Sequence, residues 1–422
     1  MPAGLLGRIS GGLTTRGRCL LAAGLAAALC AVLLNERDLL RVGVFAVVLP
    51  LLATLVAGST KISVRAAREL RSTRIPLGCA AEACLVVRSA GRLGAGRLGG
   101  RLLLEDEVPQ ELGAAPQFVV VGLPRRRAVR LSYPLHPAQR GVHSVGPLVA
   151  RITDPFGLAE FRRILAGQCR LVVTPVVVPL TGLPAGGGFG TEEAATGRGG
   201  TGRGEGGSVV RGYRQGDDLR QVHWRSTARR DTLMVRVEER PSRGTAAVLL
   251  DHRATAHRGS GPASSLEYAV SLAASLYAHL QRHGQRVRLV TQDSVNLADR
   301  TLDDTLDALA ALRAVPERDL TSGPALAGGQ DVVAVLGALG PADVEVLRHR
   351  PPGTCGYAVL LDVAAWDPDS DMAADGAPDP AQAARMLVAG GWSVAVAGPE
   401  QPLSSIWDRL CLSSGSKPAA SR

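Results

Sequence analysis

The residues of this chain whose types and spacing could do chemistry are concentrated between Val210 and Glu239. An enzymatic interpretation of this arginine-rich segment uses His223 as a general base that Asp217 orients, because a carboxylate often fixes a catalytic imidazole. No nucleophile is evident, since Ser226 follows His223 by three residues, which is about one helical turn. The segment therefore favours two other interpretations over catalysis. One is a network of Arg, Asp and Trp side chains that locks the segment onto a neighbouring sheet, and the other is a docking surface for a partner protein.

The local pattern indicates how this segment folds. Gly216-Asp217-Asp218 is typical of a turn and helix N-cap, because carboxylates accept the free N–H groups of a first turn. A short helix is expected over 219–228, with Arg220 and Trp224 four residues apart on one side. A strand is expected over 233–238.

Other patterns that resemble binding motifs lack the context that those motifs need. Residues 182–207 contain twelve glycines, and Gly197-x-Gly199-x-x-Gly202 matches a dinucleotide fingerprint by letters only, because no strand precedes it and no apolar helix follows it. We expect a flexible loop there. His279-x-x-x-His283 lacks the glutamate of a zinc-protease motif and indicates a helix C-terminus. The seven cysteines have no zinc spacing and indicate reduced thiols.

About residues 140–255 resemble the "domain of unknown function 58" family, which consists of bacterial membrane-anchored proteins typically encoded beside MoxR-type AAA+ ATPases. The residues at the characteristic positions of the motif are Arg211, Tyr213, Gly216, Asp217, Arg220, His223, Trp224 and Arg229. The segment from Arg140 to Leu158 resembles the part that precedes this motif, and we interpret Asp154-Pro-Phe-Gly157 as a structural turn. A binding role for Arg140 or Asp154 is the alternative. The family has no established reaction, so the resemblance implies an architecture and a partner rather than an activity.

From residue 246 onward, short apolar runs alternate with amphipathic runs. Strands are expected at 246–250, 286–290, 331–336, 357–361 and 393–397, and helices at 264–283, 302–312, 342–348, 381–389 and 403–412. Repeated β-α alternation predicts a parallel sheet with helices on both faces. This region resembles a von Willebrand factor A-like domain, which the family resemblance also implies.

Such domains often hold a divalent cation on an Asp-x-Ser-x-Ser loop after the first strand, because carboxylate and hydroxyl oxygens suit Mg²⁺. The corresponding run here is Asp251-His-Arg-Ala-Thr255, so Asp251 and Thr255 are the candidate ligands. Arg253 replaces the first serine, and its charge opposes a metal ion. The alternative is that Asp251 caps a helix or pairs with Arg253. Asp362, at the end of a later strand, is a further candidate carboxylate.

Residues 77–181 show short strand-like runs that are separated by Gly and Pro. Strands are expected at 83–87, 117–121, 128–133, 140–146 and 168–174. Their regular spacing predicts a small β-sandwich domain.

The N-terminal region contains two apolar runs, expected as transmembrane helices at about 19–34 and 39–58. Asn35-Glu-Arg-Asp38 separates them, and no signal-peptide cleavage site follows the first run. Basic residues flank the outer ends of both runs: Arg8, Arg16, Arg18, Lys61, Arg65, Arg68, Arg71 and Arg74. The positive-inside rule therefore predicts a hairpin in the cell membrane with both termini in the cytoplasm.

The distribution of charge argues against nucleic-acid binding. Residues 1–76 contain ten Lys/Arg and three Asp/Glu, whereas the remainder contains 38 and 35, so most of the net charge of +10 lies beside the apolar runs. The expected organisation is a hairpin (1–76), a β-sandwich-like domain (77–181), a glycine-rich loop (182–208), the central motif (209–245), the α/β domain (246–415) and a tail (416–422).

The sequence predicts a membrane-anchored accessory protein without enzymatic activity or an obligatory cofactor. Its expected partners are a MoxR-type AAA+ ATPase and other membrane proteins of the same gene cluster, as the family resemblance implies. The alternative is a membrane-bound metal-dependent hydrolase, against which Arg253 and the missing nucleophile argue.

Overall fold

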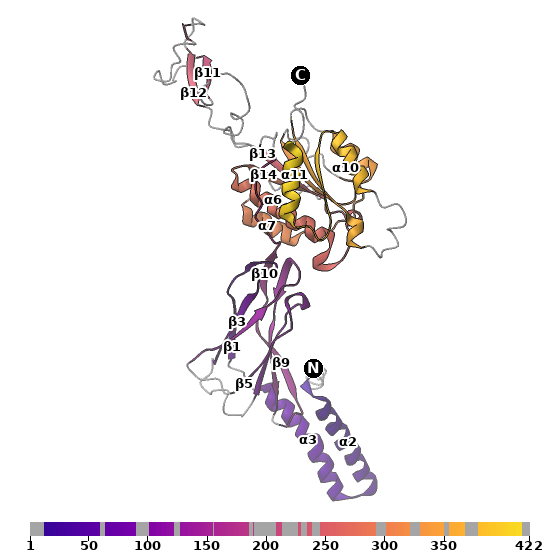
Figure 1. Ribbon diagram of the computed structural model, residues 1–422. Helices are drawn as coiled ribbons and strands as arrows, with labels where there is room; N and C mark the ends of the chain where they lie inside the picture. Colours follow the sequence, from indigo (N-terminus) through magenta and orange to yellow (C-terminus); the bar gives the residue numbers. More distant parts are fainter. Residues whose placement is uncertain are drawn as a thin grey trace. The chain divides into compact units, whose positions relative to one another are not determined.

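Two units make up the chain in the computed structural model, Met1–Thr174 and Pro175–Arg422 (Figure 1). The structure describes residues 12–59, 64–89, 101–121, 127–154, 156–184, 189, 208–212, 227–228, 234–238, 245–292, 301–320, 330–349, 354–367 and 379–415. Each unit has buried cores of its own.

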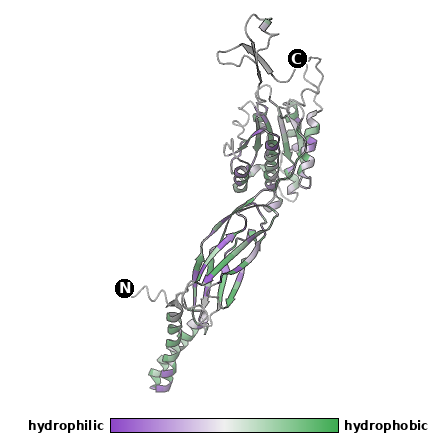
Figure 2. Cartoon of the chain, turned by 90° about the vertical axis from the view of Figure 1, so that its left-hand side faces the viewer, coloured by the Kyte–Doolittle hydropathy of each residue, from purple (hydrophilic) through white to green (hydrophobic). Residues whose placement is uncertain are grey.

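The N-terminal unit begins with two apolar helices, α2 (Thr15–Leu34) and α3 (Arg37–Ser59). The Thr14 side chain accepts a hydrogen bond from Gly17 N at 3.2 Å, and this cap starts α2 earlier than the predicted residue 19. Its 20 residues rise about 30 Å. Residues 15–34 and 37–55 are long and apolar enough to cross a membrane, by length and composition. Both helices are largely green in the hydropathy colouring of Figure 2.

Glycines bring the backbones of α2 and α3 close together. A Cβ atom on Gly24 would lie 2.9 Å from the backbone nitrogen of Val47, and one on Gly43 would lie 2.7 Å from that of Ala28. Small residues at such positions allow tight helix packing where surrounding apolar groups provide no hydrophobic driving force. The predicted pairing of two apolar helices is confirmed.

The rest of the N-terminal unit is a β domain of three small sheets, with strand orders β1-β3-β6, β2-β10-β7 and β5-β4-β8-β9. Its strands are β1 (Val64–Leu70), β2 (Arg74–Pro76), β3 (Ala81–Ser89), β4 (Arg101–Asp106), β5 (Gln117–Val121), β6 (Val129–Leu135), β7 (Gly141–Val145), β8 (Leu148–Thr153), β9 (Glu160–Ala166) and β10 (Cys169–Thr174). Alternate residues of these strands, among them Leu85, Leu104 and Leu171, form one buried core.

Both predicted boundaries of the β domain are corrected by the structure. The domain begins at Val64 rather than at residue 77, because β1 pairs antiparallel with β3 from Val64↔Ser89 to Leu70↔Ala83. It ends near Thr174 rather than at 181, because the following residues pack on the C-terminal unit. Val178 N donates to Ser275 Oγ at 2.9 Å, and Leu180 belongs to the core of that unit.

A buried ion pair lies inside the β domain. The Arg68 side chain is 2% exposed and bonds Asp106, whose side chain is fully buried. Arg68 Nε donates to Asp106 Oδ2 at 3.0 Å, and the Tyr133 hydroxyl donates to the same oxygen at 2.5 Å. Burial and the Asp106 carboxylate both raise the pKa of Tyr133. Arg68 is therefore an internal counter-ion, and the prediction that it belongs to the basic flank of the helices is wrong.

The C-terminal unit contains a parallel sheet with strand order β14-β13-β15-β16-β17. Its strands are β13 (Thr245–Leu250), β14 (Arg286–Thr291), β15 (Asp331–Leu336), β16 (Gly356–Leu361) and β17 (Ser393–Ala397). Its helices are α6 (Ser265–Arg282), α7 (Leu302–Ala311), α9 (Pro341–Arg348), α10 (Pro380–Ala389) and α11 (Leu403–Gly415). Each strand and helix predicted from residue 246 onward is present within a few residues of its expected bounds.

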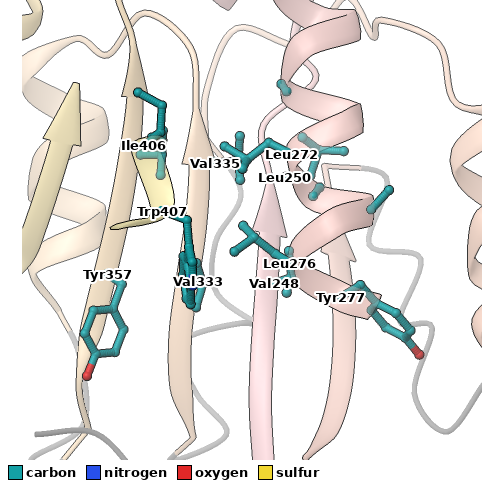
Figure 3. Close-up of a cluster of buried hydrophobic side chains, with 14 of the residues drawn as sticks. Val248, Leu250, Leu272, Leu276, Tyr277, Val333, Val335, Tyr357, Ile406 and Trp407 are labelled. Atoms are coloured by element: carbon teal, nitrogen blue, oxygen red, sulfur yellow. The ribbon is translucent and has the colours of Figure 1, made fainter. Parts of the chain in front are cut away.

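Helices cover both faces of this sheet, as predicted. Val248 and Leu250 of β13 point toward the layer of α6, α7 and α11, where Leu276 and Trp407 pack (Figure 3). Leu249, between them, joins the opposite core with residues of α9 and α10. A strand that is buried on both faces reads as a continuous apolar run, which explains why periodicity located these strands.

Candidate functional site

The strand order of the parallel sheet marks the place where a site is expected. β14 follows β13 in the chain and lies on one side of it, whereas β15 lies on the other side. The direction of winding therefore reverses between β13 and β15. In open α/β sheets, ligands bind outside the carboxyl ends of the strands at such a switch point. Asp251 directly follows β13, and Gly337 directly follows β15.

The segment after β13 is held tightly against the segment after β15. Asp251 N donates to Val335 O at 3.0 Å, and Ala338 N donates to Ala256 O at 2.9 Å. A Cβ atom on Gly337 would overlap the Ala256 carbonyl. Only glycine therefore fits at residue 337, and the two loops leave little room for a ligand between them.

Arg253 occupies the switch point with all of its donors engaged. Nε and Nη2 donate to the two oxygens of Asp251, each at 2.9 Å. Nη1 donates to Arg318 O at 2.7 Å and to Asp343 Oδ1 at 3.0 Å, and Nη2 also donates to Ala338 O at 3.4 Å. A guanidinium group has five N–H donors, so these contacts satisfy the whole group. We call this arrangement of Arg253, Asp251 and Asp343 the arginine lock.

The charges of the lock compensate one another. The side chains of Asp251 and Arg253 are 0% and 2% exposed, and that of Asp343 is 14% exposed. Burial alone lowers the pKa of Arg253, but the hydrogen bonds and charges of the two carboxylates outweigh it, so the net pKa is raised. The guanidinium therefore stays charged inside the protein.

Asp343 is a residue of the site that the sequence reasoning missed. It lies in the first turn of α9, where its Oδ2 accepts a hydrogen bond from the backbone N–H of the N-cap residue Gly340 at 2.9 Å. Its Oδ1 also accepts from Leu320 N at 3.3 Å. The run Gly340-Pro-Ala-Asp343 signals a capped helix, but nothing in it points to Arg253, which is ninety residues away.

His257 supports the arginine lock through a hydrogen bond to the backbone of Asp251. Its Nε2 lies 2.8 Å from Asp251 O, and because a carbonyl can only accept, Nε2 carries the proton. Nδ1 lies 3.1 Å from Ser265 Oγ. Burial lowers the pKa of His257, and the nearby charge of Asp251 only partly opposes this. The ring is thus held neutral as a structural hydrogen-bonding group.

The structure answers the question about Asp251 in favour of pairing with Arg253. Thr255, the other candidate metal ligand, is exposed and does not join the lock. Among the residues that the structure describes, no group of three or more His, Cys, Asp or Glu side chains could hold a metal ion. Asp362 instead lines a separate small cavity at the ends of β15 and β16, together with Gly337 and Pro380.

The histidine pair of α6 is structural. His279 is buried, and its Nε2 lies 2.7 Å from Gly182 O. Burial lowers the pKa of this ring as well. His283 is the C-cap residue of α6, as predicted, and its Nδ1 lies 2.9 Å from His279 O. The two rings thus fix the end of α6 and the incoming chain at Gly182.

Comparison with known proteins identifies the segment that contains the central motif and Arg253. Residues 209–337 match the family model "Protein of unknown function DUF58". This segment belongs to the DUF58 family. No curated protein matches the chain.

Solved structures resemble parts of the chain only weakly. The CARDB domain of a Pyrococcus furiosus protein in complex with di-metal ions is 14% identical, with 27% of this chain and 97% of that chain covered and a TM-score of 0.20. The Pseudomonas fluorescens alkylpurine DNA glycosylase AlkC, bound to DNA containing an abasic site analog, is 14% identical, with 33% and 39% covered and a TM-score of 0.18. These scores lie below 0.5 and carry no argument about fold or function.

The central motif of the DUF58 segment is described only at residues 208–212, 227–228 and 234–238, so most of the helix predicted over 219–228 lies outside the described residues. β11 (Ser208–Gly212) pairs antiparallel with β12 (Met234–Glu238), and the predicted strand at 233–238 coincides with β12. Arg211 lies in β11, opposite Val235. The other motif residues lie outside the described residues: Tyr213, Gly216, Asp217, Arg220, His223, Trp224 and Arg229. Their roles stay predictions.

Proposed function

We propose that this chain is a membrane-anchored, cytoplasm-facing accessory protein that acts by protein–protein interaction, in assembly or chaperone-like work with a MoxR-type AAA+ ATPase. The von Willebrand factor A-like character of the C-terminal unit and the sandwich character of the β domain belong to the same proposal. The family resemblance supports the choice of partner.

The surface of the two N-terminal helices supports the membrane anchor. Large apolar side chains of both helices are exposed, among them Leu29 at 63%, Leu33 at 77% and Phe45 at 66%. Such a continuous apolar surface needs a lipid or protein covering. The outer ends of the two apolar runs carry eight basic residues, or seven without the buried Arg68, whereas the connected ends carry only Arg37 and, four residues further on in α3, Arg41. This asymmetry favours cytoplasmic termini.

The position of Asp251 supports the von Willebrand factor A-like interpretation. Counted along the chain, the strand order of the sheet is 2-1-3-4-5, an order of doubly wound folds. Asp251 follows the first of these strands, where the metal-binding aspartate of such domains is expected. In this chain a guanidinium group takes the place that a cation would have.

The arginine lock is the observation that carries the proposal of an interaction protein. At the switch point, where a doubly wound enzyme would bind its ligand, Arg253 bonds both oxygens of Asp251 and one of Asp343. The site is filled by the protein's own charge, because both oxygens of Asp251 are engaged by Arg253. This arrangement stabilises a scaffold, and it argues against the alternative of a metal-dependent hydrolase centred on Asp251.

Capture of the full-length chain from its native membranes tests the proposal. A C-terminally tagged chain, cross-linked before solubilisation, is expected to recover an AAA+ ATPase. Arg220→Ala, in the central motif, is expected to reduce this recovery. Arg385→Ala is the matched control, because Arg385 is 74% exposed on α10 and lies outside the motif in the sequence. Recovery without any AAA+ ATPase, combined with Mg²⁺-dependent hydrolysis by the purified chain, would favour the hydrolase instead.

A further inference from the structure

The turn between β8 and β9 is a rigid structure built around Asp154. Asp154 Oδ2 accepts a hydrogen bond from Phe156 N at 3.0 Å, and Oδ1 accepts one from Ala159 N at 2.6 Å. Gly157 has φ +70°, a left-handed conformation that glycine adopts without strain. We call residues 154 and 156–159 the β8–β9 tip. Its sequence fixes its shape, which confirms the interpretation of Asp154 as a turn residue.

The β8–β9 tip is bonded to the start of α2. Thr14 N donates to Leu158 O at 2.9 Å, and the Thr14 hydroxyl donates to Gly157 O at 2.6 Å. A Cβ atom on Gly17 would overlap the Leu158 carbonyl oxygen, so only glycine allows this approach. The tip therefore holds the first turn of the helix in a defined position.

The tip also packs on the sides of both apolar helices. Leu158 and Ala159 form a buried cluster with Ala53 of α3, against which Leu20, Leu49 and Phe161 pack. Leu20 lies five residues after the first residue of α2, which corresponds to about 7.5 Å along the helix. Figure 1 shows β9 beside α3 at this end of the β domain. The tip thus lies at the level of residues that belong to the candidate membrane spans.

Phe156 projects from the tip without a protein covering. Phe156 is 65% exposed, although the next residue, Gly157, accepts a hydrogen bond from the Thr14 hydroxyl at the start of α2. Arg16 and Arg18, on either side of Gly17 in α2, and Arg162 of β9, six residues after Phe156, are exposed. Aromatic rings are enriched at the boundary between headgroups and acyl chains, and basic side chains favour the anionic headgroups above it.

We propose that the β8–β9 tip is a second membrane contact of this protein, with Phe156 inserted at the boundary between headgroups and acyl chains. This inference rests on the proposed membrane anchor. The occupant of the exposed Phe156 surface is the lipid bilayer, because this surface is continuous with the helices that enter it. Together with the bonds to Thr14, the contact fixes the β domain against the membrane instead of leaving it on a flexible tether.

Tryptophan fluorescence in vesicles tests the proposal on the full-length chain. Phe156→Trp adds an indole at the tip, and phospholipids brominated in the acyl chain quench indoles that reach them. Leu33→Trp, on the exposed side of α2, is the control for insertion of the helices. Val142→Trp is the control for an exposed apolar site of the same domain. Val142 is 42% exposed and pairs with Val172 of β10, in a different sheet from β8 and β9.

The comparison separates failure of this inference from failure of the anchor. After subtraction of the parent emission, we expect the Phe156→Trp signal to shift to shorter wavelength and to lose intensity in brominated vesicles, while the Val142→Trp signal keeps its intensity. If Phe156→Trp is quenched no more than Val142→Trp while Leu33→Trp is quenched, the tip does not contact lipid, although the anchor stands. If Leu33→Trp is not quenched, the membrane anchor itself is wrong, and this inference falls with it.

Discussion

Removal of Arg253 should be among the most destabilising single changes in the C-terminal unit. Arg253→Met keeps an unbranched side chain of similar volume but leaves Asp251 fully buried without its cation. Removing one partner of a buried ion pair typically costs about 3–5 kcal/mol, because the remaining charge has no compensation. Asp343 loses less, since it is partly exposed and keeps its bonds from Gly340 N and Leu320 N.

The native tryptophans report on this unit within the full-length, detergent-solubilised chain. All four lie in residues 175–422, and Trp392 and Trp407 are fully buried. At about 2–4 °C per kcal/mol for a unit of this size, Arg253→Met should lower the fluorescence-detected Tm by about 6–20 °C. Arg385→Met is the matched control. It removes an exposed arginine 3.9 Å from Asp379 and should change stability by less than about 0.5 kcal/mol.

A double-mutant cycle separates the ion pair from simple loss of packing. In Asp251→Leu/Arg253→Met both charges are removed, and replacing a buried pair by apolar groups is often close to neutral. The double variant should therefore be more stable than the sum of the single effects predicts, by about 0.5–3 kcal/mol. An Arg253→Met variant that melts like Arg385→Met, or a double variant that is strictly additive, would refute the reasoning.

Four further outcomes are expected. Calorimetry with Mg²⁺ or Mn²⁺ should show no micromolar binding, because Arg253 engages both Asp251 oxygens; micromolar binding that Asp251→Ala abolishes would contradict this. Burial lowers the pKa of His257, so its contribution to stability is present above pH 6.5 and is lost as the pH falls and the unfolded chain takes up a proton. Tm should drop as the pH falls below about 6.5, and His257→Gln should flatten the drop. In intact cells, Glu36→Cys should react with a membrane-impermeant maleimide, because residue 36 is expected outside the cell. The parent chain should not react, because its exposed Cys79 is expected in the cytoplasm. Labelling of the parent chain would mean that the topology is the reverse of the predicted one. Trp224→Ala should lower Tm or partner binding, and for a packed ring the loss of folding free energy is about 3–5 kcal/mol. His223→Gln should leave Tm and partner binding unchanged. Loss of function in His223→Gln alone would favour catalysis.

The fold of the C-terminal unit could be predicted from the sequence because each of its elements has a strong local pattern. Strands such as β15 and β16 are buried at every position, so they appear as continuous apolar runs. The helices between them are amphipathic, and Ser264 and Thr301 cap α6 and α7. Local pattern and tertiary position agree in this unit.

Some strands of the β domain were harder to predict, because strands such as β9 and β10 lack a clean alternation. β9 has three successive exposed residues, Arg162, Arg163 and Ile164, which hide its period of two. β1 contains Arg65 and Arg68 directly after an apolar helix, so its charges were assigned to the membrane flank. Such strands are defined by their neighbours, here β8 and β3, and not by their own composition.

Only part of the candidate site could be predicted from the sequence. The spacing of Asp251 and Arg253 indicated a possible pair, because two residues that follow a buried strand stay close in space. Asp343, Arg318 and Ala338 reach Arg253 only through the winding of the sheet, which brings the segments after β13 and β15 together. No local sequence pattern predicts these contacts, although the order of the strands predicts that a site lies at the switch point of the sheet.

Arg68 and Arg253 show why a count of charges must be corrected by structure before it supports a topology. Both are buried counter-ions of an aspartate, Asp106 in one unit and Asp251 in the other, and neither presents its charge to solvent or to lipid headgroups. For the membrane orientation the correction is small, since seven basic residues still flank the outer ends of the helices and only two, Arg37 and Arg41, lie at their connected ends. For the candidate site the correction is decisive. The Arg253 side chain, whose charge opposes a metal ion at Asp251, is in the folded chain the cation that pairs with this carboxylate.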